Sequence, residues 1–587
     1  MRSFIILLSA LWTYSSGRRP LVALYVCLFI LSNVVYLFEP YAVGKILNEI
    51  QHAASGQEGI KQIWWYLGLL VLLAVGFWLF HGPARILERQ NAFFVRRAFK
   101  QYLFTIVTSL PLQWHRTNHS GQTINRISKA SQALFNFTHT GSQIIGMVIR
   151  PMGALVALFL IMPGAAVLSV SVVLCFCSIA LLFDRALFPH YGKVNEREHD
   201  VASVLHDYVT NIRTVITLRL ESLTHSELWK RMTQPLPIYQ NIVCLDEMKW
   251  FTSSFFIALM TSVVLGWYAW TTMDAGGTLL VGTFFMLYDY LQKIGNAFYT
   301  FAWQYGETVE QSADFQAIEP ILTADRAEYH SNHRLPDEWS MIEIKGLQFT
   351  YEDEEESRTH LKNMSLVFHR PGKIALIGES GSGKSTLMAL LRGLHPAKAD
   401  VSCDGMRLPH GLKHLAAHVT LIPQDPEIFE NTVEYNVTLD TDQDECEVME
   451  DVRLAQFHSV VERLPKGLKT STAEKGVNFS GGEKQRLALA RGFFAADKSS
   501  IILLDEPTSS VDLDNERAIY QNLFQRFADR CVVSSLHKLY LLPLFDEAYV
   551  FKDGAVIAHG TPTELTSPGG VLHQLWERER FVNTTAR

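Results

Sequence analysis

The sequence predicts a multidomain membrane protein, in which an all-α six-helix transmembrane domain precedes a soluble α/β domain. The chain has 587 residues, of which 48% are hydrophobic. Long apolar runs fill the chain up to about residue 305, and the remainder from about residue 335 has the composition of an ordinary soluble domain. A glycine-rich loop between an apolar strand and a helix then marks the soluble part as α/β. A chain of this length suggests two or more domains.

The two parts and their connections give the expected boundaries. We expect a membrane-surface helix at 1–20 and a transmembrane domain with six helices at 21–320. A linker at 321–338 and a soluble α/β domain at 339–587 follow. The net charge of −7 gives no reason to expect nucleic acid as a partner. The seven cysteines are scattered without a CxxC pair, which favours reduced thiols over a disulfide framework or a zinc site.

The first residues, MRSFIILLSALWTYSSG, allow two interpretations. A basic start, an apolar centre and small residues are typical of a secretory signal peptide. They also fit an amphipathic helix on the membrane, with Arg2, Arg18 and Arg19 on the cytosolic side. We favour the membrane-surface helix, because another long apolar segment follows immediately.

Six segments are long and apolar enough to cross a bilayer, which takes roughly 20 residues. They are 21–43, 63–82, 142–162, 164–184, 251–271 and 278–300. Stretches of roughly 60 residues separate the pairs of spans and contain basic clusters, around Arg85–Lys100 and Arg185–Arg197. The positive-inside rule places these stretches and the N-terminus in the cytosol. Their helical periodicity indicates that the helices continue past the bilayer.

Polar residues inside the spans are costly in lipid and should face a cavity or another helix. In the sixth span Asp289, Gln292, Lys293 and Asn296 share one helical face, and Arg150 lies in the third span. We predict that these five residues line a substrate cavity. The alternative is that Asp289 and Lys293 form a local ion pair that only neutralises itself.

The soluble part contains a phosphate-binding loop. GKIALIGESGSGKSTLMALLRGL reads as a buried strand, a glycine loop and a helix. The loop glycines allow backbone N–H groups to approach phosphate oxygens at the helix N-terminus. Lys384 would supply a positive charge to the phosphates and Ser385 a hydroxyl to Mg²⁺. The predicted ATP-binding residues of this loop are Gly378, Glu379, Ser380, Gly381, Ser382, Gly383, Lys384, Ser385 and Thr386.

A second apolar strand, in SSIILLDEPTS at 499–509, ends in two carboxylates. Ligands of α/β proteins bind at the carboxyl ends of the strands. Asp505 would hold Mg²⁺ through water, and Glu506 would polarise the attacking water. A strand that ends this way, after such a loop, predicts hydrolysis of the nucleotide rather than binding alone.

The order of these motifs resembles the ATP-binding cassette domain. The sequences that carry the resemblance are FTY, GESGSGKS, IPQDPEIFENT, NFSGGEKQR, LLDEPTSSVD and SSLH. With six preceding spans in the same chain, the protein is similar to the exporter-type half-transporters, the type IV ABC exporters. The resemblance implies that Tyr351 stacks on adenine, Gln424 senses Mg²⁺ and the membrane domain, and His537 contacts the γ-phosphate.

The resemblance also implies a dimer. Ser480, Gly481 and Gly482 would cap the ATP that the P-loop of a second chain holds, with Asp512 in the loop that links the two sites. The expected cofactors are ATP and Mg²⁺, the latter on Ser385, Gln424 and Asp505. The expected partner is a second copy, with a heterodimer as the alternative. The sequence departs from the family pattern at three places. Phe479 stands where the family has Leu, Glu483 stands where it has Gln, and the loop of Asp512 reads SSVD rather than SALD. None of these changes removes a phosphate-contacting group.

Two cytosolic segments resemble the coupling elements of this family, at 111–127 and 206–222, each with an expected short helix. The implied function is ATP-driven export or lipid flipping in a cell membrane, such as a bacterial inner membrane. An importer on the same fold and an ATP-gated channel are the alternatives. The charges of the predicted cavity suit an amphipathic or anionic substrate, including a membrane lipid.

Overall fold

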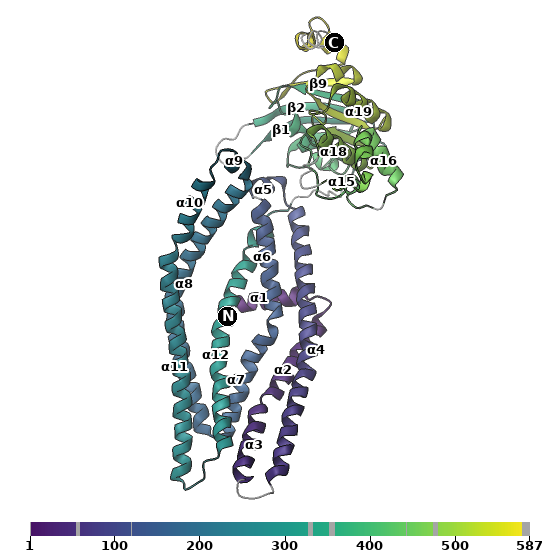
Figure 1. The fold of residues 1–587 in the computed structure, drawn as a ribbon. Helices are drawn as coiled ribbons and strands as arrows, with labels where there is room; N and C mark the ends of the chain where they lie inside the picture. The colour runs from purple at the N-terminus through teal and green to yellow at the C-terminus, as the bar shows by residue number, and fades with distance from the viewer. Residues whose placement is uncertain are drawn as a thin grey trace. The chain divides into compact units, whose positions relative to one another are not determined.

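The computed structural model describes residues 2–53, 59–118, 120–326, 333–351, 359–441, 443–472 and 479–577. The chain divides into two compact units (Figure 1). The first combines Met1–Thr105 with Ser120–Thr323, and the second combines Ile106–His119 with Ala324–Arg587. The segment 106–119, which the sequence placed in the transmembrane domain, therefore belongs to the second unit.

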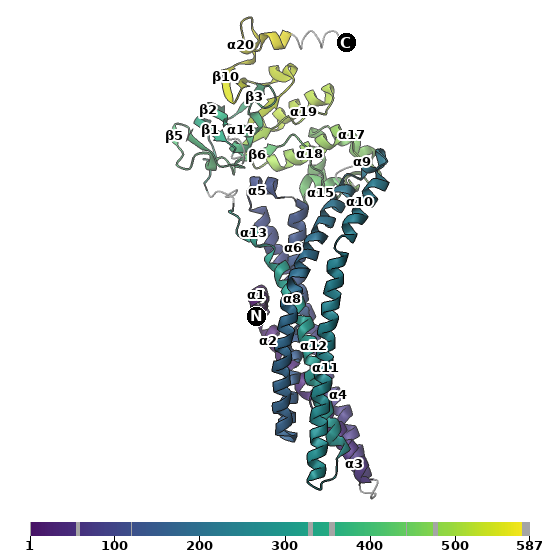
Figure 2. The same ribbon diagram turned by 90° about the vertical axis from the view of Figure 1, so that its left-hand side faces the viewer.

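All regular secondary structure among the described residues of the first unit is helical. Its longest helices run side by side in both views, as α8 and α11 do (Figures 1 and 2). Its helices are α1 (Arg2–Tyr14), α2 (Arg19–Tyr36), α3 (Glu39–Ala53), α4 (Gly59–Thr108), α6 (Ser120–His139), α7 (Gly141–Ile161), α8 (Pro163–Thr210), α9 (Ile212–Thr217), α10 (Glu221–Thr233), α11 (Leu236–Asp274), α12 (Val281–Gln316) and α13 (Glu319–Leu322).

Helices form at all six predicted spans, and several extend well beyond a bilayer. Helices α4, α8 and α11 have 50, 48 and 39 residues, about twice what a bilayer requires. The prediction that the helices continue beyond the length of a span is thus confirmed. By length and apolar composition, four segments of the described chain qualify as spans: Arg19–His52, Lys61–Thr108, Ser120–Ile161 and Glu221–Asp274. Pro163–Phe176, at the start of α8 and of the fourth predicted span, is also apolar, but this part of the helix is shorter than a span.

The first predicted span is interrupted, which the sequence analysis missed. Helix α2 ends at Tyr36, and α3 begins at Glu39. Pro40 lies in the first turn of α3, where its missing N–H costs no helical hydrogen bond. A proline there suits the start of a new helix, whereas inside a continuous helix it would remove one backbone hydrogen bond.

The N-terminal segment forms helix α1, with one face packed on the first unit. Leu7 and Leu11 are buried, whereas Ile5 and Trp12 are exposed. The guanidinium of Arg19 lies 5.1 Å from the centre of the Trp12 ring. An exposed apolar face flanked by arginine is the pattern of a helix in a membrane interface.

The described residues of the second unit form two sheets. A four-stranded antiparallel sheet has the order β2-β1-β4-β5, and a six-stranded sheet has the order β10-β9-β3-β8-β7-β6. In the larger sheet β9, β3, β8, β7 and β6 are parallel. The strands are β1 (Met341–Thr350), β2 (Thr359–His369), β3 (Gly372–Gly378), β4 (Lys398–Cys403), β5 (Met406–Arg407), β6 (Val419–Ile422), β7 (Ile501–Leu504), β8 (Cys531–Leu536), β9 (Glu547–Lys552) and β10 (Ala555–Gly560).

Helices complete the second unit. Strands β7 and β8 are buried along their whole length, as expected where helices cover both faces of a parallel sheet. The α-helices are α5 (Leu112–Thr117), α14 (Lys384–Leu391), α15 (Val433–Thr438), α16 (Glu445–Leu454), α17 (His458–Arg463), α18 (Gly481–Ala496), α19 (Leu513–Arg526) and α20 (Pro562–Thr566).

Both predicted coupling segments contain the short helix that the sequence analysis expects. Helix α5 covers six residues of the first segment, and α9 covers six residues of the second. Each lies beyond the end of a long helix, α4 or α8. The prediction of a short helix at each turn is confirmed.

Candidate nucleotide-binding site and membrane-domain polar cluster

Four parallel strands of the larger sheet, β3, β6, β7 and β8, end at the same edge. Residues that the sequence predicts to bind the nucleotide follow each of these strands. Ile422 of β6 is in register with Leu504 of β7, and Leu504 with Ser534 of β8. The P-loop follows β3, Gln424 follows β6, Asp505 and Glu506 follow β7, and His537 follows β8. The carboxyl edge of a parallel sheet is where α/β proteins bind ligands.

The P-loop backbone has the shape that phosphate binding needs. Gly381 and Gly383 have φ angles of 80° and 104°, in the left-handed region that favours glycine. A Cβ atom at Gly383 would lie 2.6 Å from Leu361. The hydroxyl of Ser382 is buried and has no hydrogen-bond partner among the residues that the structure describes. An unpartnered buried hydroxyl is costly, and it fits a ligand with many acceptor oxygens, such as a phosphate.

Lys384 begins helix α14 at the end of the P-loop and is buried, with 4% of its surface exposed. Its Nζ donates to the carbonyl oxygens of Gly378 (2.7 Å) and Glu379 (3.0 Å). Burial lowers the pKa of Lys384, while the nearby carboxylates of Glu506 and Asp505 act in the opposite direction. The ammonium group is therefore aimed into the loop and oriented by it.

The Glu506 carboxylate joins three parts of the site that are far apart in sequence. Gln424 Nε2 donates to Glu506 Oε2 at 2.7 Å. The Nε2 atom of His537 lies 2.5 Å from Glu506 Oε1. The structure thus brings together the three side chains to which the sequence analysis assigned water activation, Mg²⁺ sensing and γ-phosphate contact.

The backbone at Glu506 is unusual for a residue with a side chain. Its φ angle is 47°, in the left-handed region, and such conformations concentrate at functional sites. Ser535 supports this turn, because its Oγ accepts from Glu506 N at 2.8 Å and donates to Asp505 Oδ1 at 2.9 Å. Ser535, within the quoted SSLH motif, thereby joins the backbone of Glu506 to the carboxylate of Asp505.

The glycine-rich sequence after Phe479 forms the start of helix α18. Ser480 is the N-cap, and its hydrogen bonds go to Glu483 and Lys484 of its own helix. A Cβ atom at Gly482 would lie 2.7 Å from the carbonyl oxygen of Ser510. Only glycine fits there, because the loop of Asp512 passes directly over the helix start.

Gln485 ties this loop to helix α18, a role that the sequence analysis missed. Its buried amide accepts from Ser510 N at 2.7 Å and donates to Ser509 Oγ at 2.7 Å. Asp512 then caps helix α19, and hydrogen bonds from the Asn515 side chain and backbone lower the pKa of Asp512. The spacing of Gln485 within the quoted motif could have indicated an inward-facing residue of the helix.

Glu516 is a second residue that the sequence analysis missed. Its carboxylate is 3% exposed and accepts from Thr508 Oγ1 at 2.6 Å and from Lys538 Nζ at 2.9 Å. The Tyr540 hydroxyl donates to it as well. Thr508 lies two residues after Glu506, and Lys538 follows His537. One buried carboxylate therefore connects the turns that carry Glu506 and His537.

Tyr351, predicted to stack on adenine, directly follows strand β1 and lies in a group of aromatic rings. Its ring centre lies 4.7 Å from those of Phe349 and His360 and 5.3 Å from that of His395, all edge to face. Such packing fixes the ring plane. The stacking itself remains a prediction.

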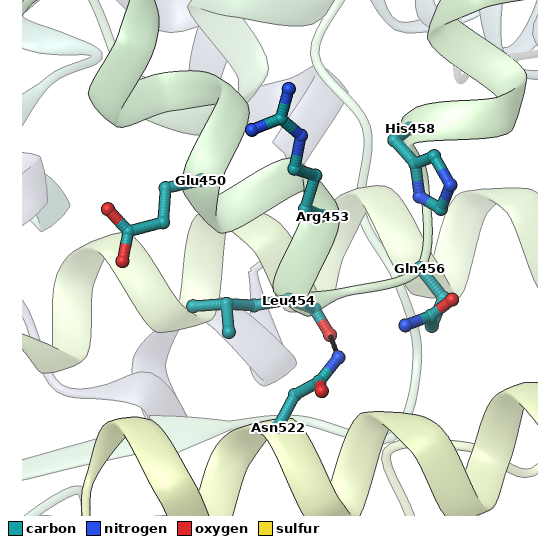
Figure 3. A pocket seen from close by; sticks show the side chains of 6 residues that line it. All are labelled: Glu450, Arg453, Leu454, Gln456, His458 and Asn522. Atoms are coloured by element: carbon teal, nitrogen blue, oxygen red, sulfur yellow. Dashed lines mark hydrogen bonds between the residues drawn. The ribbon is translucent and has the colours of Figure 1, made fainter.

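A separate hollow of about 380 Å³ lies among the helices of the second unit (Figure 3). Two of its lining residues are joined by a hydrogen bond, which Asn522 of α19 donates to the carbonyl oxygen of Leu454 (3.1 Å). The other lining residues are Glu450, Arg453, Gln456 and His458. None of the residues predicted to bind nucleotide lines this hollow, so it is distinct from the candidate ATP site.

In the first unit, three of the five predicted cavity residues meet around Tyr36 of helix α2. The Arg150 guanidinium lies 4.6 Å from the Tyr36 ring centre, and Lys293 Nζ lies 4.5 Å from it. Lys293 also pairs with Asp289 at 2.6 Å. We call this group, with Asn33, whose Oδ1 accepts from Arg150 Nε at 2.7 Å, the Tyr36 cluster.

The Tyr36 cluster bears on the two alternatives for the polar residues of the sixth span, a substrate cavity and a local ion pair. The local ion pair between Asp289 and Lys293 exists, but Lys293 and Arg150 also converge on a tyrosine that the sequence analysis did not single out. Gln292 is half-buried and Asn296 is exposed on the same helix, and the cluster does not include them. The cavity remains a prediction for all five residues.

Comparison with known proteins identifies both units. Residues 22–296 match the ABC transporter transmembrane region, and residues 361–509 match the ABC transporter family model for the ATP-binding domain. Together these matches span more than half of the chain. They confirm the predicted order of a membrane domain followed by a nucleotide-binding domain.

Several named relatives are similar to the chain. Heavy metal tolerance factor 1 of Caenorhabditis elegans is 27% identical over 83% of this chain, which spans 61% of that relative's length. A probable multidrug resistance ABC transporter ATP-binding/permease protein of Bacillus subtilis is 24% identical, over 88% of this chain and 76% of its own. ATP-binding cassette sub-family B member 6 of Homo sapiens is 33% identical over 42% of this chain and 29% of its own.

The fold itself is similar to that of a bacterial Atm1-family ABC exporter solved with ATP bound. The TM-score is 0.80, with 21% sequence identity and coverage of 96% of this chain and 98% of that one. The likeness extends over both units. With both family regions in one chain and an exporter-type fold, the protein belongs to the ABC transporters, with the organisation of an exporter-type half-transporter.

Proposed function

We propose that the protein is an ATP-driven exporter or lipid flippase that works as a dimer of two identical chains by alternating access. The observation that carries the proposal is the convergence of Gln424, Glu506 and His537 beside a P-loop, in a chain that also contains long apolar helices. Relatives named for heavy metal tolerance and multidrug resistance support export. A heterodimer with a related chain would use the same chemistry.

The P-loop residues would hold the phosphates of ATP, and Tyr351 would stack on the adenine. The unpartnered Ser382 hydroxyl and the left-handed glycines fit this role. Ser385, Gln424 and Asp505 would hold Mg²⁺, which neutralises charge on the phosphates. Lys384 would add its own positive charge at the terminal phosphates.

Glu506 would orient and polarise the water that attacks the γ-phosphate. Its hydrogen bond from Gln424 places it beside the group that is expected to respond to Mg²⁺ and to the membrane domain. His537, now on Glu506, would turn to the γ-phosphate. Negative charge that develops there would be stabilised by groups already oriented before the reaction.

A second chain would complete each site. Ser480, Gly481 and Gly482 would cap the γ-phosphate on the partner's P-loop, and Asp512 would link the two sites. ATP would drive closure because it binds the closed dimer better than the separated one. Helices α5 and α9 would transmit the closure to the membrane helices, and hydrolysis would reset them.

The Tyr36 cluster would contact the substrate. Two cations and one carboxylate give it a net positive charge, which suits an amphipathic or anionic molecule, a membrane lipid among them. We place the protein in a cell membrane, such as a bacterial inner membrane, with its nucleotide-binding domain in the cytoplasm.

ATP hydrolysis by purified, reconstituted protein tests the proposal. Glu506→Gln should retain ATP binding and lose turnover by about 10²–10³-fold, the scale of losing one catalytic electrostatic group. Asp514→Asn, an exposed carboxylate elsewhere in the same domain, is the control. Normal hydrolysis by Glu506→Gln would overturn the assignment of the water-activating residue.

The substrate site has its own test, a screen of lipids and metabolites for stimulation of ATP hydrolysis. Arg150→Ala and Lys293→Ala should each reduce the stimulated rate more than the basal rate, because the cluster lies in the membrane unit and not in the ATP site. Equal losses of both rates would refute substrate contact by these residues.

A further inference from the structure

A carboxylate lies directly beside the proposed phosphate-capping serine. Glu483 turns back onto the N-terminus of α18, where its Oε2 accepts from Ser480 N at 2.8 Å and from Ser480 Oγ at 2.9 Å. Glu483 N donates in return to Ser480 Oγ at 3.3 Å. This reciprocal arrangement is a capping box, which stabilises a helix start.

The same arrangement creates an electrostatic problem for the proposed function. A terminal phosphate that approached Ser480 would meet the negative charge of Glu483, and like charges repel most strongly where water is excluded. The phosphate would also compete for the hydroxyl proton that Ser480 donates to Glu483. A neutral glutamine at this position would not repel the phosphate.

Arg463, at the end of helix α17, supplies the opposite charge. Its Nη2 donates to Glu483 Oε1 at 3.0 Å, while its Nε donates to the carbonyl oxygen of Ser459 at 3.2 Å. Burial raises the pKa of Glu483, but hydrogen bonds from Ser480 and the Arg463 charge outweigh burial and hold the pKa below its ordinary value. Glu483 is therefore ionised, and Arg463 neutralises it.

We propose that Arg463 is a positioning residue for ATP-driven closure. It neutralises the Glu483 carboxylate beside Ser480, so that the partner's nucleotide can dock there. The inference rests on the proposed function, because it requires α18 to receive a phosphate from a second chain. The simpler reading is a surface ion pair that only adds stability. The Arg463 side chain is 69% exposed, and exposed ion pairs contribute only about 0–1 kcal/mol to stability. Loss of Arg463 should therefore change folding little under either interpretation. Only the positioning role predicts a loss of ATP hydrolysis.

Four full-length variants in the reconstituted protein separate these readings: Arg463→Ala, Glu483→Gln, the double variant, and Lys466→Ala as a control for removing a nearby exposed cation. Arg463→Ala should lower kcat/KM for ATP by about tenfold, which corresponds to about 1.4 kcal/mol. The double variant should regain activity to within about twofold of wild type, the same conversion giving about 0.4 kcal/mol. Lys466→Ala and Glu483→Gln should match or exceed wild type.

Ionic strength gives a second readout that a purely structural role would not change. Salt screens the repulsion between Glu483 and the phosphate, so the deficit of Arg463→Ala should shrink as NaCl rises. The double variant should show the same salt dependence as wild type. These measurements use initial rates at several ATP concentrations, so that effects on kcat and KM are separated.

Two results would overturn the inference: unchanged activity in Arg463→Ala, or a loss that Glu483→Gln fails to rescue. Failure of the proposed function would look different. In that case the wild-type chain itself would show no ATP hydrolysis, or would hydrolyse ATP at full rate as a monomer.

Discussion

The turns that carry Glu506 and His537 are held together by a residue that would touch neither nucleotide nor water. Glu516 accepts hydrogen bonds from Thr508, Lys538 and Tyr540 while almost fully buried. A buried carboxylate is tolerated only when charge and hydrogen bonds compensate its lost hydration. All three donors lie next to the proposed catalytic residues, so this compensation also fixes the distance between the two turns.

Replacing Glu516 by Gln should therefore impair turnover more than binding. The variant keeps the shape of the side chain but leaves Lys538 without its counter-charge, which loosens the turn after His537. We expect kcat to fall about tenfold or more, within the range for misplaced catalytic groups, while the Kd for ATP changes little. Steady-state kinetics and equilibrium nucleotide binding measure the two effects.

Asp514→Asn, an exposed change on the same helix α19, provides the matched control and should leave both quantities unchanged. If Glu516→Gln weakened ATP binding as strongly as it slowed turnover, Glu516 would have to act on the P-loop, and its assignment to the catalytic turns would be wrong.

At the scale of elements, two membrane helices approach so closely that their backbones nearly touch. Helices α3 and α12 meet at Gly44 and Gly282, and a Cβ atom at Gly282 would overlap the carbonyl oxygen of Gly44. Asn48 Oδ1 accepts from Gly282 N at 2.8 Å at the same crossing. Small residues and interhelical hydrogen bonds are the main means of helix association in a bilayer, where lipid tails remove the hydrophobic driving force.

Gly282→Ala should force these helices apart and lower the apparent unfolding temperature of the purified protein. The expected cost is about 1–3 kcal/mol, the range for overpacking a tight interior. Gly266→Ala in helix α11 is the control, because a Cβ atom there meets nothing within 4 Å, and alanine is the better helix former. Equal stability of the two variants would show that the α3–α12 crossing adjusts freely.

The elements themselves could be predicted where one local signal dominates. The P-loop, the strand before Asp505 and the six membrane helices follow from glycine spacing, apolar runs and length. The break between α2 and α3 was missed because an apolar run masks a proline that starts a new helix. Glu516, Gln485 and Tyr36 were missed for another reason, since their importance lies in partners that only tertiary structure brings near.

At the scale of the whole molecule, the central question is why one chain carries both a P-loop and the glycine-rich start of α18. Within the chain, Ser480 bonds to its own helix, and Lys384 bonds to its own loop. Each is therefore satisfied locally while oriented for a ligand. In a head-to-tail dimer, each ATP would lie between the P-loop of one chain and the α18 start of the other.

Complementation between two defective chains tests this arrangement. Lys384→Ala disables the P-loop of a chain, and Ser480→Arg blocks the start of its α18. Each nucleotide site would combine the P-loop of one chain with the α18 start of the other. A homodimer of either variant therefore contains no intact site. A mixed dimer places both defects in one site and leaves the other site with an intact P-loop and an intact α18. We expect ATP hydrolysis to reappear when differently tagged variants are coexpressed and the mixed dimer is isolated by two affinity steps.

The two homodimers, purified in the same way, are the controls for residual activity. If each chain used its own P-loop together with its own α18, every chain of the mixed dimer would carry one defect, and hydrolysis would stay at the level of those controls. Recovery towards the rate expected of one working site requires that the two surfaces come from different chains. The measurement thus decides whether the dimer, rather than the single chain, is the catalytic unit.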